Sequence, residues 1–250
     1  PPKVPCAPDA AALRALADRY ETRAFYEGDP GDPSLFMHRA GSPASQEAIA
    51  FIASSLAFGS RRVFMQCIAK IESLAGGDAD SWIRDGLYKK FFTPDSDGIT
   101  LYRYVTRGDM CYLLDRYRAI LFSHGTLGAC VAQKCGGTAS GALHALVEAF
   151  SRPSDPRYRL VPKSVSSPCK RLCMFLRWMV RDGSPVDLGV WSSFIDKSTL
   201  LVPLDTHVLS VARSLGLVSA GSPTMKTAEA LTGFLAGVFP GDPARGDYAL

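Results

Sequence analysis

Ser166-Ser167-Pro168-Cys169-Lys170-Arg171-Leu172 leads into a run of apolar residues at helical spacing, and Val202-Pro203-Leu204-Asp205-Thr206-His207-Val208 leads into another. Each stretch contains a proline shortly before the first periodic residue, where a missing backbone N–H costs a helix nothing. The first stretch places Lys170 at a helix start, and the second places Asp205 where an N-cap belongs. The two stretches predict two helices whose N-terminal ends carry an amine and a carboxylate.

The helix that follows Lys170 is predicted to have two distinct faces. Its apolar stripe should face a core and consists of Leu172, Phe175, Leu176, Met179 and Val180. A second face carries Lys170, Met174, Arg177 and Arg181. The N-terminus of a helix has unpaired N–H groups and a partial positive charge, which suit a phosphate. We therefore expect Lys170 to project beside a potential phosphate site.

Two roles remain open for Asp205. The apolar residues Val208, Val211, Ala212 and Leu215 predict a helix directly after it. Capping that helix is the usual role of an aspartate in this position. A catalytic role is the alternative, and the two are compatible because a capping carboxylate stays ionised and is held in place.

These same residues carry a family resemblance. Pro203-Leu-Asp-Thr-His-Val, followed by Ser210-Val-Ala-Arg-Ser-Leu-Gly-Leu, resembles the end of the helix-hairpin-helix DNA glycosylase core. Cys169-Lys-Arg-Leu and Met174-Phe-Leu-Arg-Trp-Met-Val-Arg resemble an uncharacterised bacterial family of that superfamily. That family is similar in turn to the archaeal 8-oxoguanine DNA glycosylases. The resemblance implies an all-α fold with two helical subdomains flanking a cleft.

The resemblance also implies a division of the chain and roles for single residues. Residues 42–195 would form a central helical subdomain with a degenerate hairpin, and residues 1–41 plus 196–250 would form the second. Lys170 would be the Schiff-base nucleophile and Asp205 its catalytic carboxylate. Met174 and Asp247 would contact the extruded base, although Met174 is equally consistent with a core position. The implied DNA contacts are Ser166, Ser167, Arg171, Arg177, Gly59, Ser60, Arg61 and Arg62.

Two of these DNA-contacting regions differ in how closely they follow the family. The turn Phe58-Gly59-Ser60-Arg61-Arg62 would fill the gap left by an extruded base, with a plain surface role for Arg61 and Arg62 as the alternative. The hairpin usually has a Gly-x-Gly turn whose N–H groups grip a phosphate. Ser166-Ser167-Pro168 stands in its place, which leaves the hairpin geometry open.

Bulk composition limits the class of protein. The 250 residues are 47% hydrophobic, which is sufficient for one large domain or two small ones. No apolar run approaches the ~18 residues of a membrane helix, and residues 1–8 show no secretory pattern, so we expect a cytoplasmic, nucleoid-associated bacterial protein. Seven scattered cysteines indicate reduced thiols. No cysteine follows Cys173, so neither an iron–sulfur cluster nor another cofactor or metal is expected.

Charge is concentrated near the lysine. The net charge is +4, but residues 152–182 contain eight basic and two acidic residues. Such a concentration is typical of a surface that contacts a phosphate backbone. A solvated basic face is the alternative.

The remaining sequence predicts short helices and no convincing strand. Helices are expected over residues 9–24, 45–57, 63–74, 109–122, 139–150 and 186–195, among about ten in all. An aromatic run between Trp82 and Tyr104 has basic neighbours, which can mark a nucleic-acid platform, but core packing is the more common use.

The resemblance thus implies a monomeric base-excision repair enzyme that acts on double-stranded DNA containing a damaged base. By the same resemblance it would be a DNA glycosylase with AP lyase activity that removes an oxidised, 8-oxoguanine-like base. One alternative is a non-catalytic helix-hairpin-helix DNA-binding protein. A second is a structural or interaction protein in which Lys170 and Asp205 form an ordinary ion pair.

Overall fold

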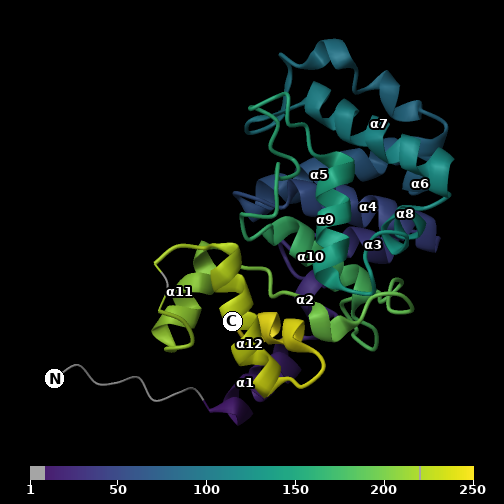
Figure 1. Cartoon of the computed structure of the whole chain (residues 1–250). Coiled ribbons are helices and arrows are strands. Elements are labelled where there is room, and N and C mark those ends of the chain that lie inside the picture. The colour runs from purple at the N-terminus through teal and green to yellow at the C-terminus, as the bar shows by residue number, and fades with distance from the viewer. Residues whose placement is uncertain (1–8, 220) are drawn as a thin grey trace.

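The computed structural model describes residues 9–219 and 221–250, and they are mostly helical (Figure 1). The α-helices are α1 (Ala10–Tyr20), α2 (Ala24–Glu27), α3 (Leu35–Arg39), α4 (Pro43–Leu56), α5 (Arg61–Ala75), α6 (Ala79–Arg84), α7 (Arg107–His124), α8 (Leu127–Ala132), α9 (Ala139–Phe150), α10 (Lys170–Val180), α11 (Thr206–Ser214) and α12 (Met225–Val238). Short 3-10 helices are η1 (Leu87–Lys90), η2 (Pro94–Ser96), η3 (Lys197–Thr199) and η4 (Pro243–Ala249). A mostly helical fold is therefore confirmed.

Two lobes are visible in Figure 1, and α10 lies between them. The larger lobe contains α3 to α9, and the smaller contains α1, α11, α12 and η4. Each has its own buried apolar cluster. The larger cluster includes Phe36 and Met37, which precede residue 42. The smaller cluster includes Val186, which precedes residue 195. The subdomain boundaries expected at residues 42 and 195 stay a prediction.

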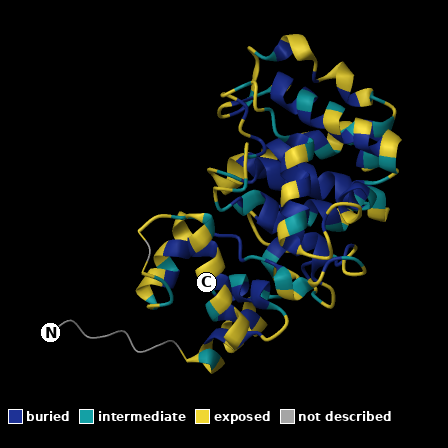
Figure 2. Ribbon diagram, viewed as in Figure 1, coloured by how far each residue is buried: buried dark blue, intermediate teal, exposed yellow. Residues whose placement is uncertain are grey.

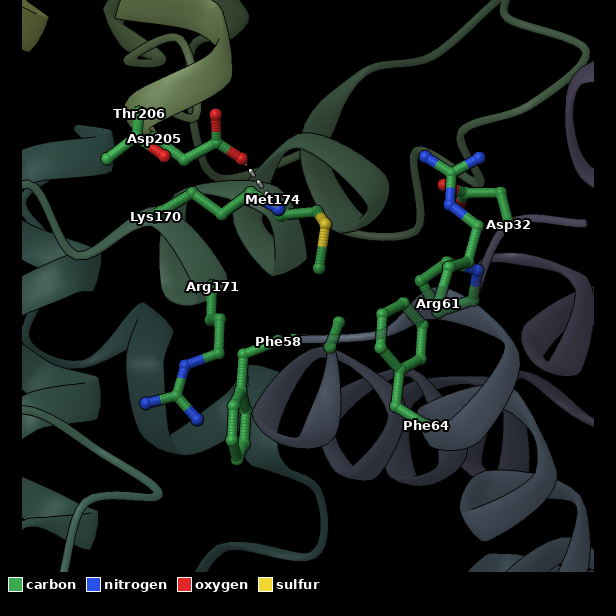
Figure 3. A pocket seen from close by; sticks show the side chains of 12 residues that line it. Asp32, Phe58, Arg61, Phe64, Lys170, Arg171, Met174, Asp205 and Thr206 are labelled. Atoms are coloured by element: carbon green, nitrogen blue, oxygen red, sulfur yellow. Dashed lines mark ion pairs between the residues drawn. The ribbon is translucent and has the colours of Figure 1, made fainter. Parts of the chain in front are cut away.

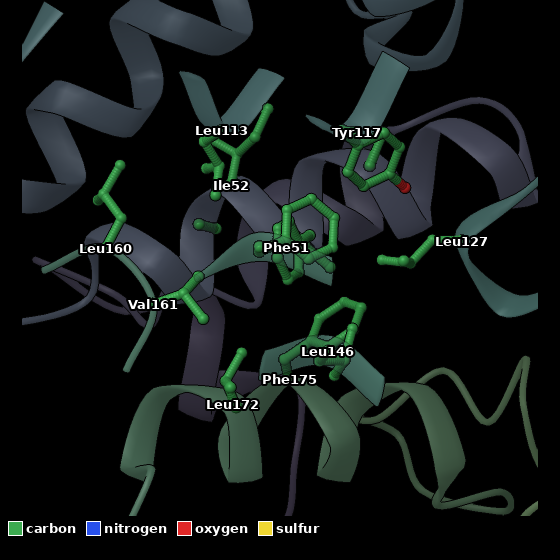
Figure 4. Packing of buried hydrophobic residues seen from close by; sticks show 14 of the residues in the cluster. Phe51, Ile52, Leu113, Tyr117, Leu127, Leu146, Leu160, Val161, Leu172 and Phe175 are labelled. Carbon is green, nitrogen blue, oxygen red and sulfur yellow. The ribbon is translucent and has the colours of Figure 1, made fainter. Parts of the chain in front are cut away.

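Helix α4 is the centre of the larger lobe, because nearly all of its residues are buried. The centroid of the Phe51 ring lies 4.3 Å from that of the Phe150 ring on α9. It lies 5.2 Å from the centroid of the Phe175 ring on α10 (Figure 4). Figure 2 shows the buried residues concentrated in this part of the molecule. These contacts hold α10, and with it Lys170, in a fixed position relative to α4.

A small β-hairpin interrupts the helical fold. Strands β1 (Thr100–Tyr102) and β2 (Val105–Thr106) pair antiparallel, and Arg103 between them has a positive φ of 51°. Such a short pair lacks the alternating pattern by which strands are predicted. Thr106 then caps α7 in a capping box with Asp109, so that helix begins two residues before the predicted Asp109.

The helix predicted over residues 186–195 is wrong. Gly189 has a φ of 66°, and the segment forms turns instead. Its N–H groups serve the preceding helix, since Leu188 donates to the Trp178 carbonyl and Trp191 to the Met179 carbonyl. The segment therefore caps the C-terminal end of α10.

Lys170 is not preceded by a compact helical hairpin. Helix α9 ends at Phe150, and a loop over residues 151–169 connects it to α10. The loop ends at Cys169, which has the left-handed φ of 47°. The glycine-free run Ser166-Ser167-Pro168 thus belongs to a long loop, where a Gly-x-Gly turn is not required.

Within the described residues, no helix combines the length and the apolar composition that crossing a membrane requires.

Candidate active site

Lys170 and Asp205 meet at the mouth of a cavity (Figure 3). The Lys170 Nζ lies 3.6 Å from Oδ2 of Asp205. Their side chains are 31% and 39% exposed, so the pair is open to solvent and to a ligand rather than closed inside the protein. The amine and the carboxylate that the sequence placed at two helix starts are therefore brought together.

Helix α11 holds Asp205 in place through one oxygen only. Asp205 is its N-cap, and Oδ1 accepts hydrogen bonds from the N–H groups of His207 at 2.9 Å and Val208 at 3.0 Å. The other oxygen, Oδ2, faces Lys170. The two roles considered for Asp205 are thus divided between its two oxygens: one caps the helix, and the other can act on a ligand.

The N-terminus of α10 carries no side-chain cap. Lys170 is its first residue, and the left-handed Cys169 turns the incoming loop away from the helix axis. The first N–H groups of α10 are therefore left for water or for an anion. A phosphate next to Lys170 would meet both a helix end and an ammonium group.

The cavity has a volume of about 550 Å³ and a mixed lining. Such a volume suits a nucleoside-sized ligand. Lys170 and Asp205 are drawn at one side of it, Asp32, Arg61 and Phe64 at the other, and Met174 between them (Figure 3). The lining residues are Asp32, Pro33, Ala57, Phe58, Gly59, Arg61, Phe64, Lys170, Arg171, Met174, Asp205 and Thr206.

The two residues expected to contact an extruded base occupy different environments. Met174 is nearly buried, and it lines the cavity one turn after Lys170. Asp247 does not line the cavity, because its carboxylate is bound to the Arg177 guanidinium. Burial raises the pKa of Asp247, whereas the nearby charges of Arg177 and Lys170 act to lower it. Asp247 is thus not among the residues that line the cavity, and its contact with an extruded base stays a prediction.

Arg177 was expected to contact DNA, a role that stays a prediction, and the structure places its side chain in the interior. It is 2% exposed and pairs with Asp187 and Asp247. Its guanidinium also lies 4.6 Å from the centroid of the Tyr248 ring. Because the side chain is enclosed by these partners, Arg177 joins α10 to the smaller lobe instead of reaching the surface.

The other expected contacts before and in α10 lie beside the cavity. Arg171 lines it, and its guanidinium donates to the carbonyls of Ser55 and Arg159. No ion pair involves Arg171 within residues 9–219 and 221–250. Ser166 and Ser167 are exposed in the loop before α10 and do not line the cavity. Arg171 therefore contributes a positive charge that no carboxylate neutralises.

The turn between α4 and α5 forms another part of the cavity wall. Gly59 has a φ of 78°, and both Gly59 and Arg61 line the cavity. Arg61 and Arg62 are exposed, whereas Ser60 is the N-cap of α5 without a side-chain hydrogen bond. The Tyr102 hydroxyl donates to the Phe58 carbonyl, so the β-hairpin supports this turn.

The basic segment over residues 152–182 does not form one exposed basic face. Arg177 and Arg181 are buried in ion pairs, and Arg152 and Arg157 pair with Asp155. Lys170 pairs with Asp205, whereas Arg159, Lys163 and Arg171 take part in no ion pair within the described residues, and of these three only Arg171 lines the cavity. Net charge along the sequence therefore overstated the basic surface, because it counted buried and neutralised groups.

Asp32 and Phe64 are cavity residues that the sequence did not single out. Asp32 lies in a run of glycines and prolines, residues 28–33, that predicts only a chain break. Phe64 lies in the first turns of α5, and its position became interpretable only once the α4–α5 turn was placed against α10. Neither residue belongs to a motif with a chemical signature.

No group of three or more potential metal ligands is found in the part of the chain that the structure describes. The chemistry that the site offers is that of an amine beside a carboxylate.

A family profile matches residues 32–250, and its description is "protein of unknown function (DUF2400)". The chain belongs to this family. The match includes Lys170, Asp205 and every residue of the cavity lining. No curated protein and no solved structure matches the chain. Membership of DUF2400 implies no particular activity, so the geometry of the site is the basis for a function.

Proposed function

We propose that this protein is a DNA glycosylase with AP lyase activity that removes an oxidised, 8-oxoguanine-like base from double-stranded DNA. In this proposal the fold is related to the helix-hairpin-helix DNA glycosylases, with residues 42–195 and residues 1–41 plus 196–250 as subdomains flanking the cleft. The protein acts as a monomer in the cytoplasm. The observation that carries the proposal is the 3.6 Å separation of the Lys170 amine and the Asp205 carboxylate at a nucleoside-sized cavity.

The chemistry follows from these two groups. The lone pair of Lys170 Nζ attacks C1′ of the damaged nucleotide, and the bond between C1′ and the base breaks with its electron pair going to the base. Asp205 stabilises the positive charge that develops on the sugar and carries the amine proton toward the departing base. The C1′–O4′ bond of the adduct then breaks: the nitrogen lone pair forms the iminium ion, and O4′ leaves with the bonding electrons and takes up a proton. Loss of a 2′ proton then expels the 3′ phosphate and nicks the strand.

Three features beyond the pair support DNA as the substrate. A base within a duplex must be extruded before a group in a cavity can reach its sugar. The cavity is lined by Phe58, Phe64 and Met174, which can cover the faces of an extruded base. The uncapped start of α10 and the unneutralised Arg171 offer sites for the flanking phosphates.

Borohydride trapping tests the proposal. Wild-type protein, incubated with duplexes that each carry one oxidised base, should give a covalent protein–DNA adduct with at least one of them. Lys170→Ala should give none, because the amine that forms the imine is absent. Lys197→Ala is the matched control, since Lys197 also pairs with a carboxylate, Asp182 at 2.6 Å, but does not line the cavity.

Two results would contradict the enzyme. One is the absence of an adduct with every lesion, and the other is an undiminished adduct in Lys170→Ala. Specific duplex binding that persists without any adduct would favour the non-catalytic DNA-binding protein. The observation that favours this second candidate is the long loop over residues 151–169, which replaces a compact hairpin.

A further inference from the structure

Asp32 is a second carboxylate in the cavity, and nothing in the proposed chemistry uses it. It is 8% exposed and lines the wall with Arg61 and Phe64, across from Lys170 and Asp205 (Figure 3). A nearly buried carboxylate that faces a cavity is unfavourable unless it serves the fold or a ligand. The hydrogen bonds of its two oxygens distinguish these two uses.

Only one oxygen of Asp32 is used by the protein. Its Oδ1 accepts from the N–H of Ser34 at 3.0 Å and from the hydroxyl of Ser34 at 2.7 Å. Oδ2 accepts no hydrogen bond and takes part in no ion pair with any residue that the structure describes. The fold thus accounts for the position of Oδ1 but gives Oδ2 no partner among the described residues.

The same chain contains a turn of the same type that serves as a comparison. Asp196 and Ser198 repeat the Asp-x-Ser arrangement, but there Ser198 donates its N–H to Oδ1 at 2.8 Å and its hydroxyl to Oδ2 at 2.6 Å. Asp196 does not line the cavity. Both oxygens can therefore be satisfied within such a turn, whereas Asp32 directs both bonds to one oxygen and leaves the other open.

We propose that Oδ2 of Asp32 reads the edge of the extruded base and selects bases that present adjacent N–H donors. This inference rests on the proposed function. An ionised carboxylate only accepts hydrogen bonds, and its free oxygen offers two lone pairs. A guanine-type base presents a ring N–H beside an exocyclic amino group. Thymine flanks its ring N–H with two carbonyl oxygens, which a carboxylate repels.

The layout of the cavity agrees with this assignment. If the sugar lies against Lys170 and Asp205, the base extends toward the opposite wall, where Asp32 is found. In a purine nucleoside the ring N–H and amino group form the edge farthest from the sugar. Arg61 lines the same wall and can donate to the neighbouring carbonyl oxygen of such a base. Asp247, bound to Arg177, does not line the cavity.

Asp32→Asn separates base reading from folding. The amide oxygen keeps accepting from Ser34, so the turn is retained, while the open position becomes an N–H donor that opposes the donors of the base. Asp196→Asn makes the same change in the comparison turn, away from the cavity. Equal thermal unfolding of both variants and wild type would show that the turns remain intact.

The decisive measurement compares trapping on duplexes with 8-oxoguanine and with 8-oxohypoxanthine, which lacks the amino group. Wild type and Asp196→Asn should favour 8-oxoguanine by about tenfold or more, the effect of one hydrogen bond to a charged acceptor. Asp32→Asn should reduce this preference to within about twofold. A wild type that traps both bases equally, or an Asp32→Asn that keeps the preference, overturns the role of Asp32 but leaves the glycosylase intact.

Failure of the proposed function would look different, because no base at all would be trapped. Titration of wild type with free guanosine and inosine, followed by NMR, then decides the role of Asp32 without any chemistry on DNA. Tighter binding of guanosine that disappears in Asp32→Asn supports it. Guanosine that binds no more tightly than inosine refutes it.

Discussion

At the scale of single residues, the two oxygens of Asp205 allow its structural and chemical roles to be measured separately. The free energy of unfolding of Asp205→Asn should lie within a few tenths of a kcal/mol of the wild-type value, because asparagine caps helices about as well as aspartate. It should nevertheless lose the trapped adduct, since the charge next to Lys170 is gone. Asp205→Ala should lose the adduct and also about 1 kcal/mol of stability. Thermal or urea unfolding and borohydride trapping are the two measurements.

A second capping aspartate serves as the control. Asp9 caps α1, with Oδ1 accepting from the N–H of Ala11 at 2.9 Å, and it does not line the cavity. Asp9→Ala should therefore cost stability like Asp205→Ala and leave the adduct unchanged. An Asp205→Asn variant that traps as well as wild type would reduce Asp205 to a cap.

The sequence was informative for Lys170 and Asp205 because each stands at a helix start with a recognisable pattern around it. It was less informative for Arg177, since the spacing that places Arg177 on the same face as Lys170 does not say what covers that face. Asp187 and Asp247 cover it: Asp187 comes from the turns that follow α10, and Asp247 comes from η4, 70 residues after Arg177. Tertiary contacts of this kind leave no periodic signal.

At the scale of elements, the turn between α4 and α5 depends on the absence of a side chain at Gly59. A Cβ at this position would lie 2.7 Å from Nη1 of Arg103 and 2.8 Å from the hydroxyl of Tyr102, and the φ of 78° is strained for any other residue. Gly59→Ala should therefore destabilise the protein by about 2 kcal/mol or more, from backbone strain plus overpacking. Urea unfolding measures this loss.

Gly77 isolates the backbone part of that effect. Its φ is 84°, but a Cβ added there would meet no other group within 4 Å. Gly77→Ala should thus cost only the strain, on the order of 1 kcal/mol. If Gly59→Ala and Gly77→Ala lose the same free energy of unfolding, a clash between the added Cβ and the β-hairpin contributes nothing to the effect at Gly59.

Most helices were predictable because their apolar residues recur at helical spacing. The helices predicted near residues 45–57, 63–74 and 139–150 correspond to α4, α5 and α9. The segment 186–195 was mistaken for a helix because Val186, Trp191 and Ile195 are buried at roughly helical spacing. They are buried by wrapping around the end of α10, where glycine turns and bonds to the α10 carbonyls determine the backbone.

At the scale of the whole molecule, a buried charge network connects the two lobes. Arg181 of α10 binds Glu21 at 2.8 Å, Asp242 at 2.8 Å and Asp187. Arg245 binds Glu21 from the other side at 2.7 Å. Removing one partner of such a buried network leaves the others without their counter-charge, which is costly. The network therefore fixes α10 relative to the two parts of the smaller lobe that come from the N-terminal and C-terminal ends of the chain.

Glu21 makes this connection sensitive to acid. Burial acts to raise its pKa, but Arg181 and Arg245 outweigh burial and hold the pKa below the ordinary value of 4.5. A carboxyl group with a lowered pKa stabilises the fold fully above its unfolded pKa and loses that contribution as the pH falls through the folded one. Glu21→Gln should therefore be less stable than wild type at pH 7, by about 1–3 kcal/mol.

The difference between the two proteins should shrink as the pH falls below 4.5. Chemical unfolding at a series of pH values between neutrality and acid measures it. A difference that stays constant across the series would show that the charge of Glu21 is not what stabilises the junction.

The wide separation of these partners along the chain has a consequence for biosynthesis. Asp242 and Asp247 follow their arginines by 61 and 70 residues, and Glu21 precedes Arg181 by 160. While a ribosome is still translating the region between, Arg177 and Arg181 have been made but Asp242 and Asp247 have not. Until that last segment is synthesised, the nascent chain therefore lacks part of the counter-charge that surrounds these two arginines in the finished protein.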